Sequence, residues 1–248
     1  MSARLPMPDP HAALLDRLAA ADRAESRRAA GEALQRISAE PALRDALREG
    51  LAAGAPAARF AAAWVLFHAE RPTLRLLPAL LDALELADGD VRWQAVQMLA
   101  VLGRLHGEVL PVLLAEARGA AAPLRRRMAL YALRELAPER EETSAVLLAA
   151  LADADGHVRR AALSCFAKLR DPPRELAVRA LELAQGSDPD PRMARIAAVV
   201  LPDLVRAHPE LRGEVERALG ALEHAADPSL ARAALAARQR LPAEHAAP

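Results

Sequence analysis

Hydrophobic residues recur along the chain at the spacing of an α-helix, in segments separated by short polar breaks. Segments 72–87, 88–103 and 108–119 each carry such a stripe. In 88–103 the stripe consists of Val91, Ala95, Met98, Leu99 and Leu102. The breaks are rich in Asp, Ser, Gly and Pro, and Asp or Ser in such a break can cap the helix that follows. The pattern predicts a succession of amphipathic helices without strands.

The same pattern returns at a nearly constant interval. The stretches 88–103, 122–137 and 154–170 align well, and each has an Arg shortly after its polar break. The marker arginines of all copies, the weaker ones included, are Arg27, Arg59, Arg92, Arg125, Arg159, Arg192 and Arg232. Their successive spacings are 32, 33, 33, 34, 33 and 40 residues. A period of this length that holds two helices predicts an all-α repeat protein of about seven helix pairs.

The motif D-x-x-V-R-x-x-A-x-x-x-L in these copies resembles the HEAT repeat. Asp88-Gly89-Asp90-Val91-Arg92 and Asp155-Gly156-His157-Val158-Arg159 carry the resemblance best. The short period is similar to that of the bacterial HEAT-like repeats first noted in phycobilin lyases, whereas the sequence patterns of ankyrin and tetratricopeptide repeats do not occur. The resemblance implies a right-handed α-α superhelix, a HEAT/armadillo-like solenoid. We expect one repeat domain over 11–241, with tails over 1–10 and 242–248.

Composition narrows the classes of function. The 248 residues include 33 basic and 33 acidic side chains, and this net charge of zero argues against bulk binding to nucleic acid. The single cysteine, Cys165, excludes a disulfide framework and a thiolate zinc site. The chain has no apolar run of the roughly 18 residues that a membrane span needs, and its first ten residues lack the apolar core of a secretion signal. We expect a cytoplasmic monomer that does not enter a membrane.

The marker arginines have two interpretations. A row of arginines could bind phosphate groups. In the HEAT family, by contrast, an Asp and the Arg that follows it stack between neighbouring repeats as a ladder, and Arg suits this role because it binds a carboxylate with two parallel bonds. The resemblance implies such a structural ladder for Asp90, Arg92, Asp155, Arg159, Asp190 and Arg192. Arg59 and Arg125 lack a preceding Asp, which leaves their part in the ladder open.

Candidates for catalysis or metal binding are few. The chain has no His-Glu dipeptide of the kind that a HEAT-like di-iron hydroxylase family uses, so its seven histidines are expected to be surface or capping residues. It also has no G-x-S-x-G, H-E-x-x-H, P-loop or G-x-G-x-x-G motif. Cys165 lies inside an apolar helix and is expected in the core. We predict no catalytic site, no metal and no cofactor.

One surface of the second helices stands out as a candidate binding site. Counted from the residue before the marker Arg, positions +2, +6 and +10 form a stripe away from the core. The predicted binding residues on or beside this stripe are Phe60, Trp64, Trp93, Gln97, Arg126, Arg134, Arg160 and Lys168. Large aromatic anchors beside arginines are typical of binding sites. Two alternatives stay open, namely that the aromatics fill gaps between Ala-rich helices and that the basic residues are a solvated face.

These observations lead to two functional hypotheses of different classes. The first is a non-enzymatic scaffold that binds a peptide or protein partner with an acidic or amphipathic segment on its concave face. The alternative is a duplex DNA-binding protein related to a HEAT-like DNA glycosylase family. That alternative is weaker because two Trp, one Tyr and three Phe leave few aromatics to hold a flipped base. A lyase role is suggested only by the phycobilin-lyase resemblance.

Overall fold

The computed structural model describes residues 11–20, 22–169 and 171–242. Within these ranges the chain forms fourteen α-helices and three short 3-10 helices, η1 (Leu74–Leu76), η2 (Phe166–Lys168) and η3 (Pro209–Leu211), and has no strand. The helices alternate as seven pairs, which confirms the fold class predicted from the repeat. The predicted tails over 1–10 and 242–248 lie outside the described residues, apart from Pro242. No described helix combines the length and the apolar character required to cross a bilayer.

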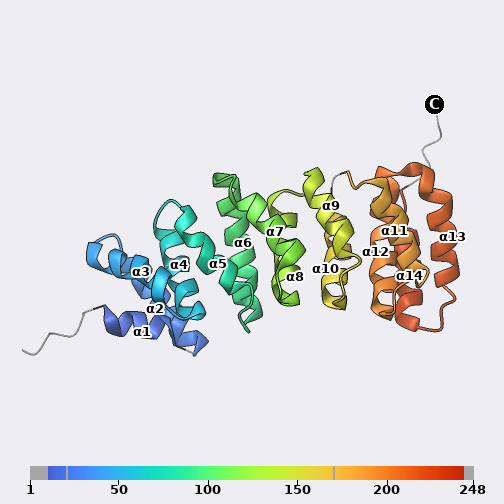
Figure 1. Cartoon of the computed structure of the whole chain (residues 1–248). Helices are drawn as coiled ribbons and strands as arrows, with labels where there is room; N and C mark the ends of the chain where they lie inside the picture. The colour runs from blue at the N-terminus through green and yellow to red at the C-terminus, as the bar shows by residue number, and fades with distance from the viewer. Residues whose placement is uncertain (1–10, 21, 170, 243–248) are drawn as a thin grey trace, which may run out of the picture. The chain divides into compact units, whose positions relative to one another are not determined.

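The chain divides into two compact units, and each is described by itself. Unit 1 (Met1–Val109) contains three helix pairs (Figure 1, blue to green). In order these are α1 (Ala12–Leu18) with α2 (Arg23–Arg36), α3 (Pro41–Ala53) with α4 (Pro56–Ala69), and α5 (Leu77–Ala83) with α6 (Gly89–Leu105). Helix α4 packs against α2 and α5, and α5 packs against α6. The single domain expected over 11–241 stays a prediction.

Unit 2 (Leu110–Pro248) contains the other four pairs, apart from Val109, the first residue of α7. They are α7 (Val109–Gly119) with α8 (Pro123–Leu136), α9 (Glu141–Ala150) with α10 (Gly156–Cys165), α11 (Arg174–Ala184) with α12 (Pro191–Ala207), and α13 (Arg212–Leu222) with α14 (Pro228–Gln239). The second helices α8, α10, α12 and α14 pack one against the next. In each unit we call the surface that the second helices present the second-helix face.

The caps and the core follow from the residues at fixed repeat positions. An Asp accepts a backbone N–H at the start of five second helices, namely Asp22, Asp88, Asp155, Asp190 and Asp227. Such a cap contributes about 1 kcal/mol to helix stability. Between the helices, leucines spaced four apart are buried, as with Leu43 and Leu47 of α3, while consecutive alanines let α4 approach its neighbours closely.

Two histidines close helix pairs in the same way in the two units. His106 follows α6, and its Nε2 lies 2.9 Å from the carbonyl oxygen of Pro72 at the start of the same pair. His208 follows α12, and its Nε2 lies 2.6 Å from the carbonyl oxygen of Pro172. In each case the ring satisfies a backbone acceptor at the loop before the first helix. These two histidines therefore connect the end of a second helix to the loop before the first helix of the same pair.

Candidate functional site

In four of the seven second helices, α4, α6, α8 and α10, the fourth residue is an arginine that holds the marker position. At this position Arg92, Arg126 and Arg159 each donate from Nη1 to two carbonyl oxygens of the loop that follows the preceding first helix. The fourth copy therefore has Arg126 as its marker, where the sequence alignment used Arg125. The reason is that α8 begins at Pro123, which places Arg126 fourth. Arg125 instead binds Glu116 of α7, with Nε 2.7 Å from Oε2.

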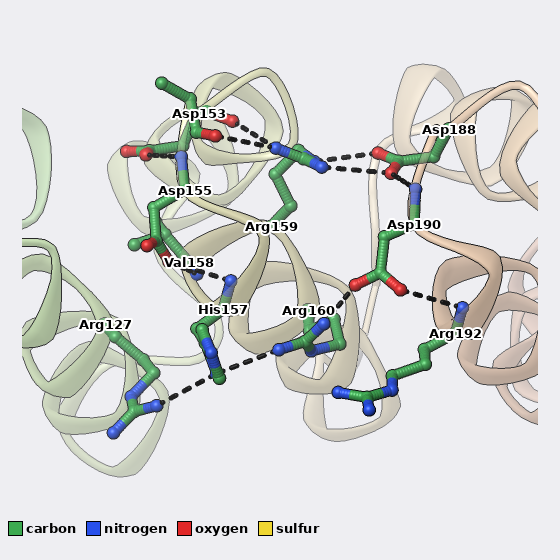
Figure 2. A network of polar contacts seen from close by, with 11 residues as sticks. Arg127, Asp153, Asp155, His157, Val158, Arg159, Arg160, Asp188, Asp190 and Arg192 are labelled. Carbon is green, nitrogen blue, oxygen red and sulfur yellow. Dashed lines mark hydrogen bonds and ion pairs between the residues drawn. The ribbon is translucent and has the colours of Figure 1, made fainter.

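An ion-pair ladder joins neighbouring repeats of unit 2. Arg126 binds Asp153 through two bonds of 2.8 and 2.9 Å. Arg159 binds Asp188 through two bonds of 2.8 and 3.0 Å, as Figure 2 shows. The Arg159 and Asp188 side chains are only 13% and 5% exposed. The hydrogen bond from Arg126 lowers the pKa of Asp153 below its usual range, although burial opposes the shift. We call these two pairs the ladder.

The predicted ladder carboxylates have other partners. Asp155 caps α10, and its Oδ1 accepts the N–H groups of His157 and Val158. Asp190 caps α12 by accepting the N–H of Arg192, and its second oxygen binds Arg160 (Figure 2). The ladder Asp thus lies two residues before the cap Asp, because the capping geometry turns the cap side chain toward its own helix. In unit 1, Arg92 has the marker position, and Asp90 binds Arg23 of α2.

The predicted basic half of the binding stripe is neutralised within unit 2. Arg126 belongs to the ladder, and Arg160 binds Asp190 while donating to Nδ1 of His157 at 2.8 Å. Arg134 and Lys168 both bind Glu135, at 2.7 and 3.1 Å. The Arg134 guanidinium also lies 5.1 Å from the centre of the Tyr131 ring. The four cations are therefore not a free basic patch. Lys168 alone of the four has a largely exposed side chain, at 55%.

The predicted aromatic half lies in unit 1 and divides into two environments. Phe60 is buried, and Trp64 is half-buried with its ring 4.2 Å from that of His68. Trp93 and Gln97 of α6 are both exposed. The structure thus brings Phe60 and Trp64 together on α4 and leaves Trp93 and Gln97 on the outer surface of α6.

Phe60 and Trp64 line a pocket of about 640 Å³ on the second-helix face of unit 1. Three second helices form its walls, with Ala30 and Gly31 from α2, Phe60 and Trp64 from α4, and Val91 and Gln94 from α6. Leu18 at the end of α1 and loop residues 19–20 and 86–88 complete it. A Cβ atom on Gly31 would have no heavy atom within 4 Å, so the wall is open at this point. The volume lies in the range of roughly 300–1,000 Å³ that binding pockets usually occupy.

Charged residues of α2 and α6 stand at the rim of this pocket. Arg23 binds Asp88, with Nε 3.1 Å from Oδ2, and also binds Asp90. The hydrogen bond from Arg23 lowers the pKa of Asp90. Arg27 is 61% exposed, and its Nη2 lies 3.7 Å from the same Asp90, beyond hydrogen-bond distance. Arg23, Arg27 and Gly31 were not predicted as site residues, because the sequence does not tell which repeats approach one another.

An exposed apolar row runs along α6 beside the residues that line the pocket. Among the described residues, the exposed large apolar side chains are Trp93, Val101 and Leu105 of α6, Val199 of α12 and Leu235 of α14. Trp93, Gln97, Val101 and Leu105 follow one another at four-residue spacing, so they share one side of the helix. Neighbouring Val91 and Gln94 belong to the pocket wall. We call Trp93, Gln97, Val101 and Leu105 the α6 row.

Chemistry at the remaining candidate groups is limited by burial and spacing. Cys165 is fully buried, and burial raises the pKa of its thiol to about 12. A thiol in this environment is a core side chain rather than a nucleophile. Within the described ranges, no three His, Cys, Asp or Glu side chains gather closely enough to hold a metal ion.

Comparison with known proteins identifies the fold. No protein-family model and no curated protein matches the chain. Among solved structures it is similar to a designed armadillo repeat protein in complex with the peptide (KR)4, with a TM-score of 0.50, 16% identity, and coverage of 93% of this chain and 98% of that one.

Two further similarities are with the complex of CpcE and CpcF of phycocyanin lyase from Nostoc sp. PCC7120 and with an engineered protein. The first has a TM-score of 0.37 and 19% identity over 98% of this chain and 99% of that one. The second has a TM-score of 0.42 and 16% identity over 92% and 94%. From its seven helix pairs and its likeness to the armadillo design, the chain has the fold of the HEAT/armadillo-like repeat proteins.

Proposed function

We propose that the chain is a non-enzymatic interaction scaffold that binds a peptide or protein segment on the second-helix face of unit 1. The observation that carries this proposal is the juxtaposition on α6 of a pocket wall, which includes Val91, and an exposed apolar row that begins at Trp93. Apolar side chains that stay exposed around a preformed pocket are typical of protein interaction sites. The proposal moves the site toward the N-terminal part of the predicted stripe.

The fold supports the proposal because repeat solenoids offer an extended surface on one set of helices. A designed armadillo repeat protein of the same fold holds the peptide (KR)4. That peptide is basic, and the partner that we propose here is acidic or amphipathic. The charge preference of such proteins depends on the side chains of the second helices, so we derive it from the pocket rim of this chain rather than from the designed protein.

The charges of unit 2 favour this scaffold over duplex DNA binding. A protein that binds duplex DNA neutralises phosphates with several available cations. Arg126, Arg159 and Arg160 are instead committed to Asp153, Asp188 and Asp190. We therefore propose a protein partner rather than duplex DNA. We also propose that the protein acts as a monomer, without a metal or cofactor.

The experiment is affinity capture from the source cells with wild type beside Trp93→Ala. Trp93 is 41% exposed, so its removal should leave the fold intact, and it should reduce recovery of the specific partner by about tenfold or more if Trp93 is a hot spot. The matched control is Leu235→Ala, which removes an apolar side chain of similar exposure, 49%, from a second helix of unit 2.

Equal recovery of the partner by wild type and Trp93→Ala would contradict the proposed site. Loss of the partner with Leu235→Ala and not with Trp93→Ala would move the site to unit 2. Recovery of nucleic acid in place of a protein partner would favour the duplex-binding alternative. Circular dichroism and thermal melts of both variants establish that any loss of binding is not a loss of folding.

A further inference from the structure

The pocket of unit 1 has a rim contact that reaches beyond the neighbouring repeat. The ladder pairs of unit 2 join residues 27 and 29 positions apart, one repeat onward. Arg23 and Asp90 lie 67 positions apart, which is two repeats onward. Arg23, at the start of α2, thus reaches past α4 to the start of α6. Ala57, at the start of α4, lines the pocket. Arg23 also lines the pocket, so the contact lies at the pocket edge.

Apolar surface makes up the interior beneath this contact. Phe60, Ala61 and Trp64 of α4 lie between Ala30 of α2 and Val91 of α6. Gly31 lines the same pocket and leaves space beside it, since no heavy atom would lie within 4 Å of a Cβ atom at this position. A side chain that enters here leaves water and contacts aromatic and aliphatic groups, which favours burial of an apolar side chain. The interior therefore suits an apolar anchor.

The rim carries an arginine whose acidic neighbour is already engaged. Asp88 accepts the N–H groups of Asp90 and Val91 and binds Arg23, and Asp90 binds Arg23 as well. The Asp90 carboxylate lies 3.7 Å from Nη2 of Arg27, and the Arg27 side chain is 61% exposed. Its guanidinium donors are thus accessible from solvent at the pocket mouth, where a carboxylate of a bound segment could accept two of them. The rim therefore favours an anion beside the apolar anchor.

We propose that this pocket binds an apolar anchor side chain of a partner peptide that carries a carboxylate next to the anchor, and that the carboxylate binds Arg27 and competes with Asp90 for Arg23. The inference rests on the proposed function and names the chemistry of its partner. Asp90 then acts as an internal mimic of the peptide carboxylate. Its removal should help binding, while removal of Arg27 should hinder it.

The probes are three fluorescein-labelled twelve-residue Ala-rich peptides with Leu anchors four residues apart, flanked by Glu, by Gln or by Lys. Fluorescence anisotropy measures their Kd for the full chain. We expect the Glu peptide to bind about tenfold more tightly than the Lys peptide. The anchor spacing presents both leucines on one side of a helical peptide, as helix-in-groove recognition requires.

Four variants test the parts of the pocket separately. Gly31→Phe fills the pocket and should raise the Kd of the Glu peptide by about tenfold or more. Gly31→Ala adds one methyl group in open space and should bind the Glu peptide as wild type does. Arg27→Gln should raise the Kd of the Glu peptide about tenfold and leave the Kd of the Gln peptide unchanged. Asp90→Asn should tighten binding of the Glu peptide severalfold, since it removes one of the two carboxylates that Arg23 binds and leaves the Asp88 cap in place.

Several results would overturn the inference. They are equal binding of the Glu and Lys peptides, no measurable binding of any of the three, unchanged binding by Gly31→Phe, and weaker binding by Asp90→Asn. Dimerisation of wild type that Gly31→Phe abolishes would instead show that a second copy fills the pocket. If Gly31→Phe melts below wild type, Gly31→Leu replaces it in the same assay.

The outcome for the pocket is separable from the outcome for the proposed function. If the captured partner binds Gly31→Phe as it binds wild type and is lost with Trp93→Ala, the pocket is not the anchor site and the scaffold proposal stands. If both variants retain the partner, both proposals fail. Loss with both variants supports the two together.

Discussion

The two units use the same repeat position in opposite ways. In unit 2 the residue two positions before the cap Asp is Asp153 or Asp188, and each binds the marker arginine of the preceding repeat. In unit 1 the residue two positions before the cap Asp88 is Leu86, which lines the pocket. The marker Arg59 therefore finds its carboxylate elsewhere, at Asp82 of α5.

This difference shows how one backbone supports both a stabilising face and a binding face. The helix pairs, caps and marker arginines recur in both units, so the period determines the scaffold. The second-helix face of unit 2 is crossed by charge pairs that satisfy one another. In unit 1 that surface has an apolar pocket, rimmed by Arg23 and Arg27, and the α6 row. The residue two positions before the cap Asp thus helps to decide which kind of face a repeat presents.

The largest effect that separates the units is expected from removal of a ladder arginine. Arg159→Ala leaves Asp188, 5% exposed, without its bidentate partner and should lower the free energy of unfolding by on the order of 3 kcal/mol. Arg59→Ala in unit 1 should cost about 1 kcal/mol, because Arg59 and Asp82 are 20% and 30% exposed. Urea denaturation of both variants measures the two values.

The double variant Arg159→Leu/Asp188→Asn provides the control for this prediction. The introduced amide would keep an acceptor for the N–H of Asp190, which the Asp188 carboxylate now accepts at 2.8 Å. With both charges removed, most of the lost stability should return, since an unpaired buried charge is worse than an apolar replacement. Equal unfolding curves for wild type and Arg159→Ala would show that the ladder does not stabilise unit 2.

A smaller effect is expected when pH changes the stability that the ladder pair Arg126–Asp153 contributes. The hydrogen bond from Arg126 places the folded-state pKa of Asp153 below the unfolded value of about 3.9. The stabilisation is therefore fully present above the unfolded pKa and is lost as pH falls through the folded pKa. The stability difference between wild type and Asp153→Asn should be largest near neutral pH and should shrink below about pH 4. Urea melts at a series of pH values down to about 2.5 measure it.

A difference that stays constant across this range would show that the Asp153 charge contributes nothing through its pKa. The matched variant is Asp171→Asn, because Asp171 is exposed and lies outside the ladder. Its difference from wild type is measured over the same pH series. A pH dependence as strong as that of Asp153→Asn would place the effect in the protein as a whole rather than in the ladder.

The repeat could be predicted from the sequence because period, caps and apolar stripes are local features. Register within a helix was harder to predict where similar residues are adjacent. Arg125, Arg126 and Arg127 are consecutive, and only the start of α8 at Pro123 shows that Arg126 is the marker. That one-residue shift moves Arg126 from the outer stripe into the ladder.

The pocket could be predicted only in part. Phe60 and Trp64 were identified because aromatics are scarce in the chain, and scarcity is visible in the sequence. Gly31 was not identified, because an absent side chain gives no signal in the sequence. Arg23 was not identified, because its contact with Asp90 depends on how three repeats stack. Interactions between distant repeats are determined by packing angles that no single repeat encodes.

The smallest effect concerns two glycines, one in each unit. Gly31 lies within α2 with open space around its Cβ position, and it is not among the residues of positive φ. Gly31→Ala should therefore raise the free energy of unfolding by about 0.5–1 kcal/mol, because Ala is the better helix former. Gly186 follows α11 with a φ of 90°, which a side chain rarely adopts, so Gly186→Ala should lower stability by about 1 kcal/mol. Urea denaturation measures both changes. A higher free energy of unfolding for Gly31→Ala and a lower one for Gly186→Ala would establish that the wall of the pocket at Gly31 is open. A destabilised Gly31→Ala would show that the space beside Gly31 is already filled.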